Sequence, residues 1–112
     1  MEDLSEKKCV PCEGWVAPYP MEEAKKLMEK VPGWNLDEQK SEIFREFKFK
    51  NFYQTMSFVN AVAFVANQEN HHPDLEVGYN YCHLHYHTHA IKGLSENDFI
   101  CAAKINKLLS EK

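Results

Sequence analysis

Histidine recurs at every second position in the segment Cys82-His83-Leu84-His85-Tyr86-His87-Thr88-His89. Successive side chains of a β-strand point to opposite faces, so this period of two predicts a strand that carries four imidazoles on one face. Leu84 and Tyr86 then point the other way, and an apolar sheet face of this kind is usually covered by helices. The segment therefore predicts a layered α+β fold in which one face of the sheet stays open.

The rest of the chain alternates between helical and strand periods. The predicted elements are, in order, a helix over 21–31, strands over 34–36 and 43–49, a helix over about 52–70, a hairpin over 75–89 and a helix from 95 onward. Short turns join the strands of each pair, which is typical of antiparallel sheets. We therefore expect an α+β fold with a four-stranded antiparallel sheet and three helices packed on one face, in the order α-β-β-α-β-β-α.

The chain has 112 residues, enough for a single domain over 1–112. Residues 1–18 are expected to be a loosely ordered lead-in, because Pro11, Pro18 and Pro20 interrupt regular structure there. At the other end, Ser95 is expected to cap the last helix, with Asp98 in the reciprocal position of a capping box.

The charge of the chain argues against several classes of function. It has 13 Lys and Arg against 17 Asp and Glu, a formal charge of −4, and a single arginine, Arg45. Nucleic-acid binders need a basic face for phosphate contacts, so we expect no nucleic-acid partner. No apolar run approaches the ~20 residues that span a membrane, and the acidic first residues do not resemble a secretory signal. We therefore expect a cytoplasmic protein without membrane contact.

The cysteines Cys9, Cys12, Cys82 and Cys101 are too few and too scattered to form a disulfide framework. Cys9 and Cys12 form a Cys-x-x-Cys pair, but no second pair exists to complete a structural zinc site. The preferred interpretation is a flexible tail, and a metal or redox role for the pair is the alternative.

All six histidines lie within residues 71–89, and three interpretations compete for them. Half-exposed rings such as His83, His85 and His87 are tolerable surface residues without a role. Alternatively, neighbouring rings could bind a metal ion, although the carboxylates Glu69, Asp74 and Glu76 are not obviously placed to complete its ligand set. The third interpretation is metal-free acid–base catalysis, because an imidazole exchanges protons near neutral pH.

The chain resembles the pterin-4a-carbinolamine dehydratases, also called 4a-hydroxytetrahydrobiopterin dehydratases. The motifs that carry the resemblance are Asn70-His71-His72-Pro73, Tyr79-Asn80, His83, Thr88-His89 and Gly93-Leu94-Ser95-Glu96-Asn97-Asp98, with Gly33-Trp34 and the segment 43–52 upstream. Together they cover most of residues 20–110. The family has a four-stranded antiparallel sheet with helices on one face, in agreement with the order of elements above.

The resemblance implies a hydro-lyase that removes water from 4a-hydroxytetrahydropterin to give quinonoid dihydropterin, with neither a metal nor another cofactor. His71, His72 and His89 would be the catalytic residues, with His71 and His89 as the acid–base pair and His72 chiefly holding the pterin. Asp98 would orient and charge His89, although it also fits a simple helix cap. Trp34 would border the substrate, although it also fits a core tryptophan.

One position departs from the family. Four residues before the first histidine the family usually has a charged residue, often Glu, where this chain has Asn67. Positions 67 and 71 share a helix face, so Asn67 could accept a hydrogen bond from His71 without adding charge. We therefore expect His71 to be less basic than in relatives, which would shift the acid role toward His89. His85 and His87 are further departures.

The resemblance also bears on partners. It implies a homodimer or homotetramer and a link to aromatic amino acid hydroxylases, whose tetrahydropterin cofactor the reaction would help to recycle. Animal members also act as dimerisation cofactors for a transcription activator, so a protein-binding role is an alternative function. A histidine-rich metal-binding protein is the other alternative.

Overall fold

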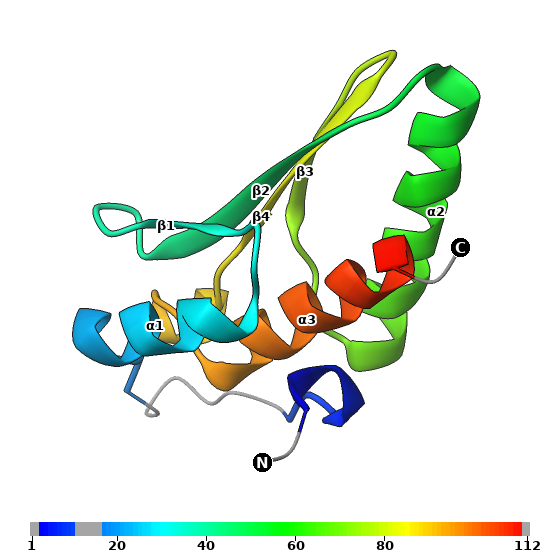
Figure 1. The fold of residues 1–112 in the computed structure, drawn as a ribbon. Helices are drawn as coiled ribbons and strands as arrows, with labels where there is room; N and C mark the ends of the chain where they lie inside the picture. The colour runs from blue at the N-terminus through cyan, green and yellow to red at the C-terminus, as the bar shows by residue number, and fades with distance from the viewer. Residues whose placement is uncertain (1–2, 11–16, 111–112) are drawn as a thin grey trace.

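The alternating segments of the chain form one antiparallel sheet. The computed structural model describes residues 3–10 and 17–110. The strands are β1 (Asn35–Asp37), β2 (Glu42–Lys48), β3 (Asp74–Val77) and β4 (Tyr81–Tyr86), and the helices are α1 (Met21–Leu27), α2 (Phe52–Glu69) and α3 (Glu96–Ser110). The spatial order of the strands is β1-β2-β4-β3, and every neighbouring pair is antiparallel (Figure 1). The predicted fold class and order of elements are confirmed.

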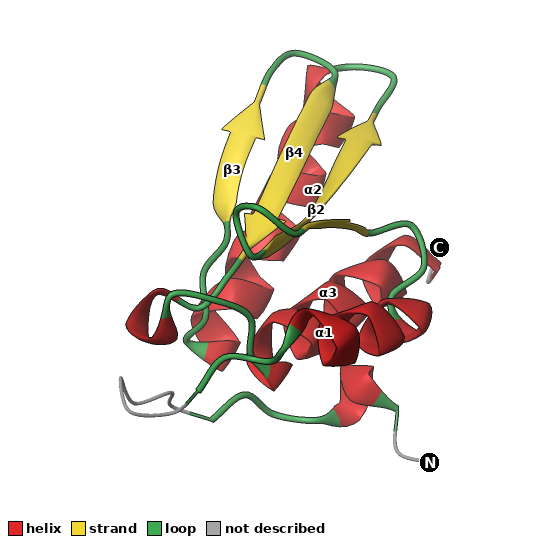
Figure 2. Ribbon diagram, turned by 90° about the vertical axis from the view of Figure 1, so that its left-hand side faces the viewer, coloured by secondary structure: helices red, strands yellow, loops and turns green. Residues whose placement is uncertain are grey.

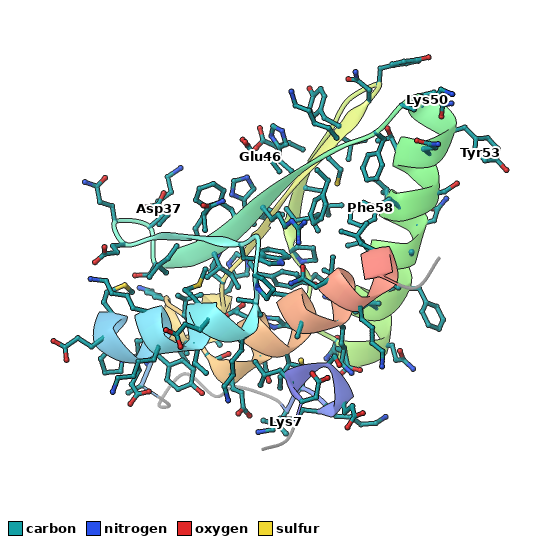
Figure 3. All side chains as sticks on the ribbon, in the orientation of Figure 1. Lys7, Asp37, Glu46, Lys50, Tyr53 and Phe58 are labelled. Atoms are coloured by element: carbon teal, nitrogen blue, oxygen red, sulfur yellow. The ribbon has the colours of Figure 1, made fainter. Side chains whose placement is uncertain are left out.

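The two faces of the sheet differ as the period of two requires. Cys82, Leu84 and Tyr86 of β4 are fully buried toward the helices, whereas His83 and His85 lie half-buried on the other face. Phe58 of α2 reaches between the helix and the sheet, and Glu46 of β2 projects from the opposite side (Figure 3). The helices therefore cover one face of the sheet.

The prediction that four histidines share one strand face is wrong for the last two, His87 and His89. β4 stops at Tyr86, where its partners stop as well: Ile43 pairs with Tyr86 at the start of β2, and Asp74 pairs with His85 at the start of β3. Beyond Tyr86 the chain turns away, and an antiparallel bridge between Thr88 and Gly93 closes a short loop. His87 and His89 therefore leave the sheet face that His83 and His85 share.

Helix α3 lies at the centre of the core. It carries an unbroken run of buried residues from Asn97 to Ala103, because other parts of the chain cover it on several sides. A short 3₁₀ helix, Leu4–Glu6, packs on its outer side (Figure 2). Within the described ranges, no helix has the combination of length and apolar character that would carry it across a bilayer.

The lead-in differs from the expected loose segment over residues 3–10. Leu4 is buried in the core, and Lys104 of α3 donates a hydrogen bond to the Ser5 carbonyl at 2.8 Å. The Cys9 amide donates to Glu69, and the Cys9 sulfur lies 3.6 Å from that of Cys101, both as free thiols. Cys12, the other half of the Cys-x-x-Cys pair, lies outside the described residues.

Leu84 offers a test of this packing. We expect Leu84→Ala to lower the free energy of unfolding by about 2–5 kcal/mol, the usual cost of emptying a leucine site in a core. Leu75→Ala is the matched control, because Leu75 pairs with Leu84 across the β3–β4 ladder but is 41% exposed. Its cost should stay below about 1 kcal/mol. Urea denaturation measures both, and equal losses would contradict the difference in burial between Leu84 and its partner on the edge strand β3.

Candidate active site

The end of α2 sets the position of the first two histidines. Asn70 ends the helix in the left-handed conformation, with φ 51° and ψ 42°, which asparagine tolerates better than most residues. The His71 amide then donates to the Ala66 carbonyl at 3.1 Å, and Pro73 prevents any further helical turn. The two imidazoles therefore emerge from a fixed backbone.

Contacts on two sides hold the His71 ring. Its Nε2–H donates to the Oδ1 atom of Asp98 at 2.7 Å, and the ring stacks on Tyr86 with 5.5 Å between ring centres and 10° between planes. The Tyr86 hydroxyl donates to the His71 carbonyl at 3.3 Å. With Nε2 committed to Asp98, Nδ1 is the nitrogen available to a ligand.

Asp98 is a fully buried carboxylate, and such a group is stable only when donors surround it. Its Oδ2 atom accepts hydrogen bonds from the Thr88 hydroxyl at 2.8 Å and from the Ser95 amide at 2.9 Å. The hydrogen bond from the Ser95 amide to the Asp98 carboxylate is the one that the predicted capping box requires of Asp98. The Ser95 hydroxyl lies 2.7 Å from the Thr88 hydroxyl, so the loop and the start of α3 are bonded to each other as well.

The ion pair changes the acidity of His71. Burial disfavours the charged imidazolium, but the hydrogen bond and the negative charge of Asp98 outweigh it, so the pKa of His71 is raised above its ordinary value. One expectation is corrected: Asp98 pairs with His71 rather than with His89. That His71 is less basic than in relatives stays a prediction, and the charge that Asn67 does not supply comes here from a carboxylate of α3.

Asn67 contacts the other histidine. Its Oδ1 atom accepts a hydrogen bond from His72 Nε2 at 3.0 Å, whereas a bond to His71 was expected. His72 is exposed at the rim of the site. The reason for the difference is the left-handed turn at Asn70, which ends the helical spacing on which the expectation relied.

His89 is the first residue of a short 3₁₀ helix, His89–Ile91, that follows β4. It is exposed, and its Nδ1 atom lies 3.2 Å from the Nε2 atom of His87, with the two rings edge to face. The candidate ligand atoms of Asp74, His87 and His89 all lie within 4.8 Å of one another. We refer to these three residues as the Asp74 cluster. Among the described side chains they are the best placed to hold a metal ion.

A pocket of about 620 Å³ joins these groups. Its walls are the end of α2, the loop after β4 and the N-terminal segment, and they comprise Cys9, Val10, 68–74, 87–90 and Asn97. The pocket brings together His71, His72 and His89, which come from two separate segments of the chain. Sequence reasoning missed Cys9, Val10 and Asn97, because no local pattern signals that the lead-in folds back over α3.

Trp34 is not part of this pocket. It is 6% exposed, packs against Tyr86 and Phe47, and donates from Nε1 to Asn106 at 2.8 Å. The expectation that it borders the substrate is replaced by the alternative, a core tryptophan. It supports Tyr86, on which His71 in turn stacks.

These observations define an α+β protein whose pocket contains several histidines and a histidine–carboxylate pair. The sequence profile of the family described as pterin 4 alpha carbinolamine dehydratase matches residues 17–108. The chain belongs to this family.

Individual relatives agree. A protein of Nitrosomonas europaea and one of Legionella pneumophila strain Lens, both provisionally named pterin-4-alpha-carbinolamine dehydratases, are each 59% identical to this chain. The alignments cover 95% and 96% of this chain and 93% and 96% of the relatives.

Solved structures show the same fold. A Brucella melitensis protein described as a transcriptional coactivator/pterin dehydratase superposes with a TM-score of 0.77 and 28% identity over 81% of this chain and 97% of that one. A pterin dehydratase-like protein described as a RuBisCO assembly factor superposes with a TM-score of 0.61 at 22% identity, over 71% of this chain and 93% of that one. The second likeness concerns the fold alone.

Asp98→Asn tests the source of the raised pKa of His71. The substitution removes the charge but leaves the burial, so the pKa of His71 should fall below its value in the unchanged protein. A pH titration of the imidazole NMR signals measures this directly. His85 is the internal control. Burial lowers its pKa, but hydrogen bonds to Glu42 and Glu76 outweigh burial and raise the pKa overall, and the substitution at Asp98 changes neither carboxylate. If the pKa of His71 does not change, the charge of Asp98 is not the reason that this pKa is raised.

Proposed function

We propose that this protein catalyses the dehydration of 4a-hydroxytetrahydropterin to quinonoid dihydropterin. Membership of the family supports the dehydratase class and a pterin substrate. The observation that carries the proposal is the buried Asp98–His71 pair, which adjoins a pocket that also contains His72 and His89. This pocket offers several proton-exchanging groups to one small ligand.

The reaction needs one acid and one base. The acid protonates the hydroxyl oxygen on C4a, the C4a–O bond breaks, and water departs. The base removes the proton from N5, and the electron pair of the N5–H bond forms the N5=C4a double bond. The loss of water involves no net change in oxidation state, so the chemistry requires no redox cofactor.

His71 is the proposed acid. Its raised pKa keeps it charged to higher pH than an ordinary histidine, which favours donation to a leaving hydroxyl. His89 is the proposed base, and the exposed His72 holds the pterin ring. This assignment gives His71 the acid role that the sequence alone had shifted toward His89.

The surface of α2 supports self-association. Tyr53 and Phe64 are 81% and 67% exposed, and because they are eleven residues apart they lie on the same side of the helix. Tyr53 points away from the rest of the molecule in Figure 3. We propose that this face is buried in a homodimer or homotetramer.

A protein-binding role is the second candidate. The Brucella protein is described as a transcriptional coactivator as well as a pterin dehydratase, and the exposed face of α2 would suit a partner helix. The dehydratase is preferred because the histidine pocket has no use in such a role. Turnover by a protein that also binds a partner would support both.

The dehydratase is tested by following the dehydration of freshly prepared 4a-hydroxytetrahydropterin by ultraviolet absorbance in the presence of EDTA. The unchanged protein should accelerate the reaction, and His71→Ala and His89→Ala should each slow it by roughly 10²-fold or more, the scale of a lost acid or base. His85→Gln is the control, because His85 lies outside the pocket and bonds to Glu42 and Glu76. No acceleration by the unchanged protein would refute the proposed activity.

The proposed assembly predicts a mass in solution that is a multiple of 13.1 kDa by light scattering. Phe64→Glu places a charge in the proposed contact and should reduce that mass, because an unpaired charge is costly to bury. The control is Lys50→Glu, which changes charge at an exposed position just before α2 without removing an aromatic contact. A 13.1 kDa species for the unchanged protein would exclude the oligomer.

A further inference from the structure

A ring nitrogen of His87 faces a ring nitrogen of His89, so the two rings can share a proton or bind one metal ion. Their facing nitrogens, Nε2 of His87 and Nδ1 of His89, lie 3.2 Å apart. In the neutral state one of the two must carry the hydrogen and the other must accept it. Two nitrogens bound to one tetrahedral zinc ion would lie about 3.3 Å apart, given Zn–N bonds of about 2.0–2.1 Å. The observed pair already has this separation.

The backbone brings a carboxylate to the same place. Asp74 is the first residue of β3 and pairs with His85 of β4, so it lies beside the point where β4 ends and His87 follows. One of its carboxylate oxygens lies within 4.8 Å of a ring nitrogen of each histidine, and its side chain is exposed. Two imidazoles and a carboxylate are a donor set that first-row transition metals favour.

His85, the other histidine near several carboxylates, lacks this arrangement of ligand atoms. His85 donates or accepts through both of its nitrogens, to Glu42 at 2.6 Å on one side and to Glu76 at 3.0 Å on the other. Its two partners therefore lie on opposite sides of the ring, whereas the ligand atoms of the Asp74 cluster all lie within 4.8 Å of one another. Among the described residues only the Asp74 cluster brings three ligand atoms together in this way.

We infer that Asp74, His87 and His89 form a binding site for a divalent first-row transition metal such as zinc, with the fourth coordination position open to the pocket. All three residues line that pocket. A metal on His89 Nδ1 takes up the lone pair of that nitrogen and leaves a proton on Nε2, so the ring can no longer act as a base. Given the proposed function, on which this step rests, metal binding inhibits the dehydratase.

Calorimetric titration of the metal-free chain with zinc tests the site itself. The unchanged protein should bind one zinc per chain. Removing a ligand in His87→Ala should weaken binding at least tenfold, since even the outer partners of metal ligands contribute about 10–100-fold. His85→Ala is the matched control and should bind as the unchanged protein does. His87→Gln, which retains a polar side chain, guards against misfolding, and the circular dichroism of each variant is compared first.

Weak or non-stoichiometric binding by the unchanged protein would overturn the site. Equal binding by the unchanged protein and both His87 variants would overturn it as well, because the zinc would then lie elsewhere.

A second measurement separates the site from the proposed function. With saturating zinc, dehydration should fall at least tenfold and recover when EDTA is added. Stoichiometric zinc binding without any turnover in EDTA would refute the dehydratase but leave the metal site standing. Turnover in EDTA together with undiminished turnover at saturating zinc would overturn the inhibition.

Discussion

The buried carboxylate of Asp98 is the interaction on which the site depends. A charge with no exposure to solvent requires donors, and here the donors come from three separate segments: His71 after α2, Thr88 after β4 and the Ser95 amide before α3. Satisfying one carboxylate therefore joins the end of a helix, the end of a strand and the beginning of another helix. The pocket forms where these three ends meet.

The same contacts connect the proposed catalysis to folding. Tyr86 belongs to the buried face of the sheet, yet its ring supports His71 and its hydroxyl bonds to the His71 backbone. Trp34 packs behind Tyr86 in the core. The acidity proposed for His71 thus follows from residues whose first role is packing. His89, in contrast, is exposed at the start of the short 3₁₀ helix His89–Ile91, where it is accessible for the proposed proton transfer or metal binding.

Local sequence patterns were sufficient for the elements of the fold. The alternation around Leu84 and Tyr86 identified the buried face of β4, and Pro73 identified the end of α2. They failed where a contact joins distant segments. Asn67 and His71 should meet by helical spacing, but the left-handed turn at Asn70 directs Asn67 to His72 instead. The sequence around Asp98 likewise did not indicate that this carboxylate would pair with His71 rather than with His89.

The sequence by itself determined the α+β class, the order of elements and the set of histidines from which the site is drawn, because hydrophobic periodicity and turn residues act over short range. Only the tertiary structure decided which histidine pairs with Asp98, that Asp74 lies beside His87 and His89, and that Cys9 and Val10 of the lead-in line the pocket. These outcomes depend on where strands lose their ladder partners and where a buried charge finds its donors. Both are fixed by contacts between segments far apart in the chain.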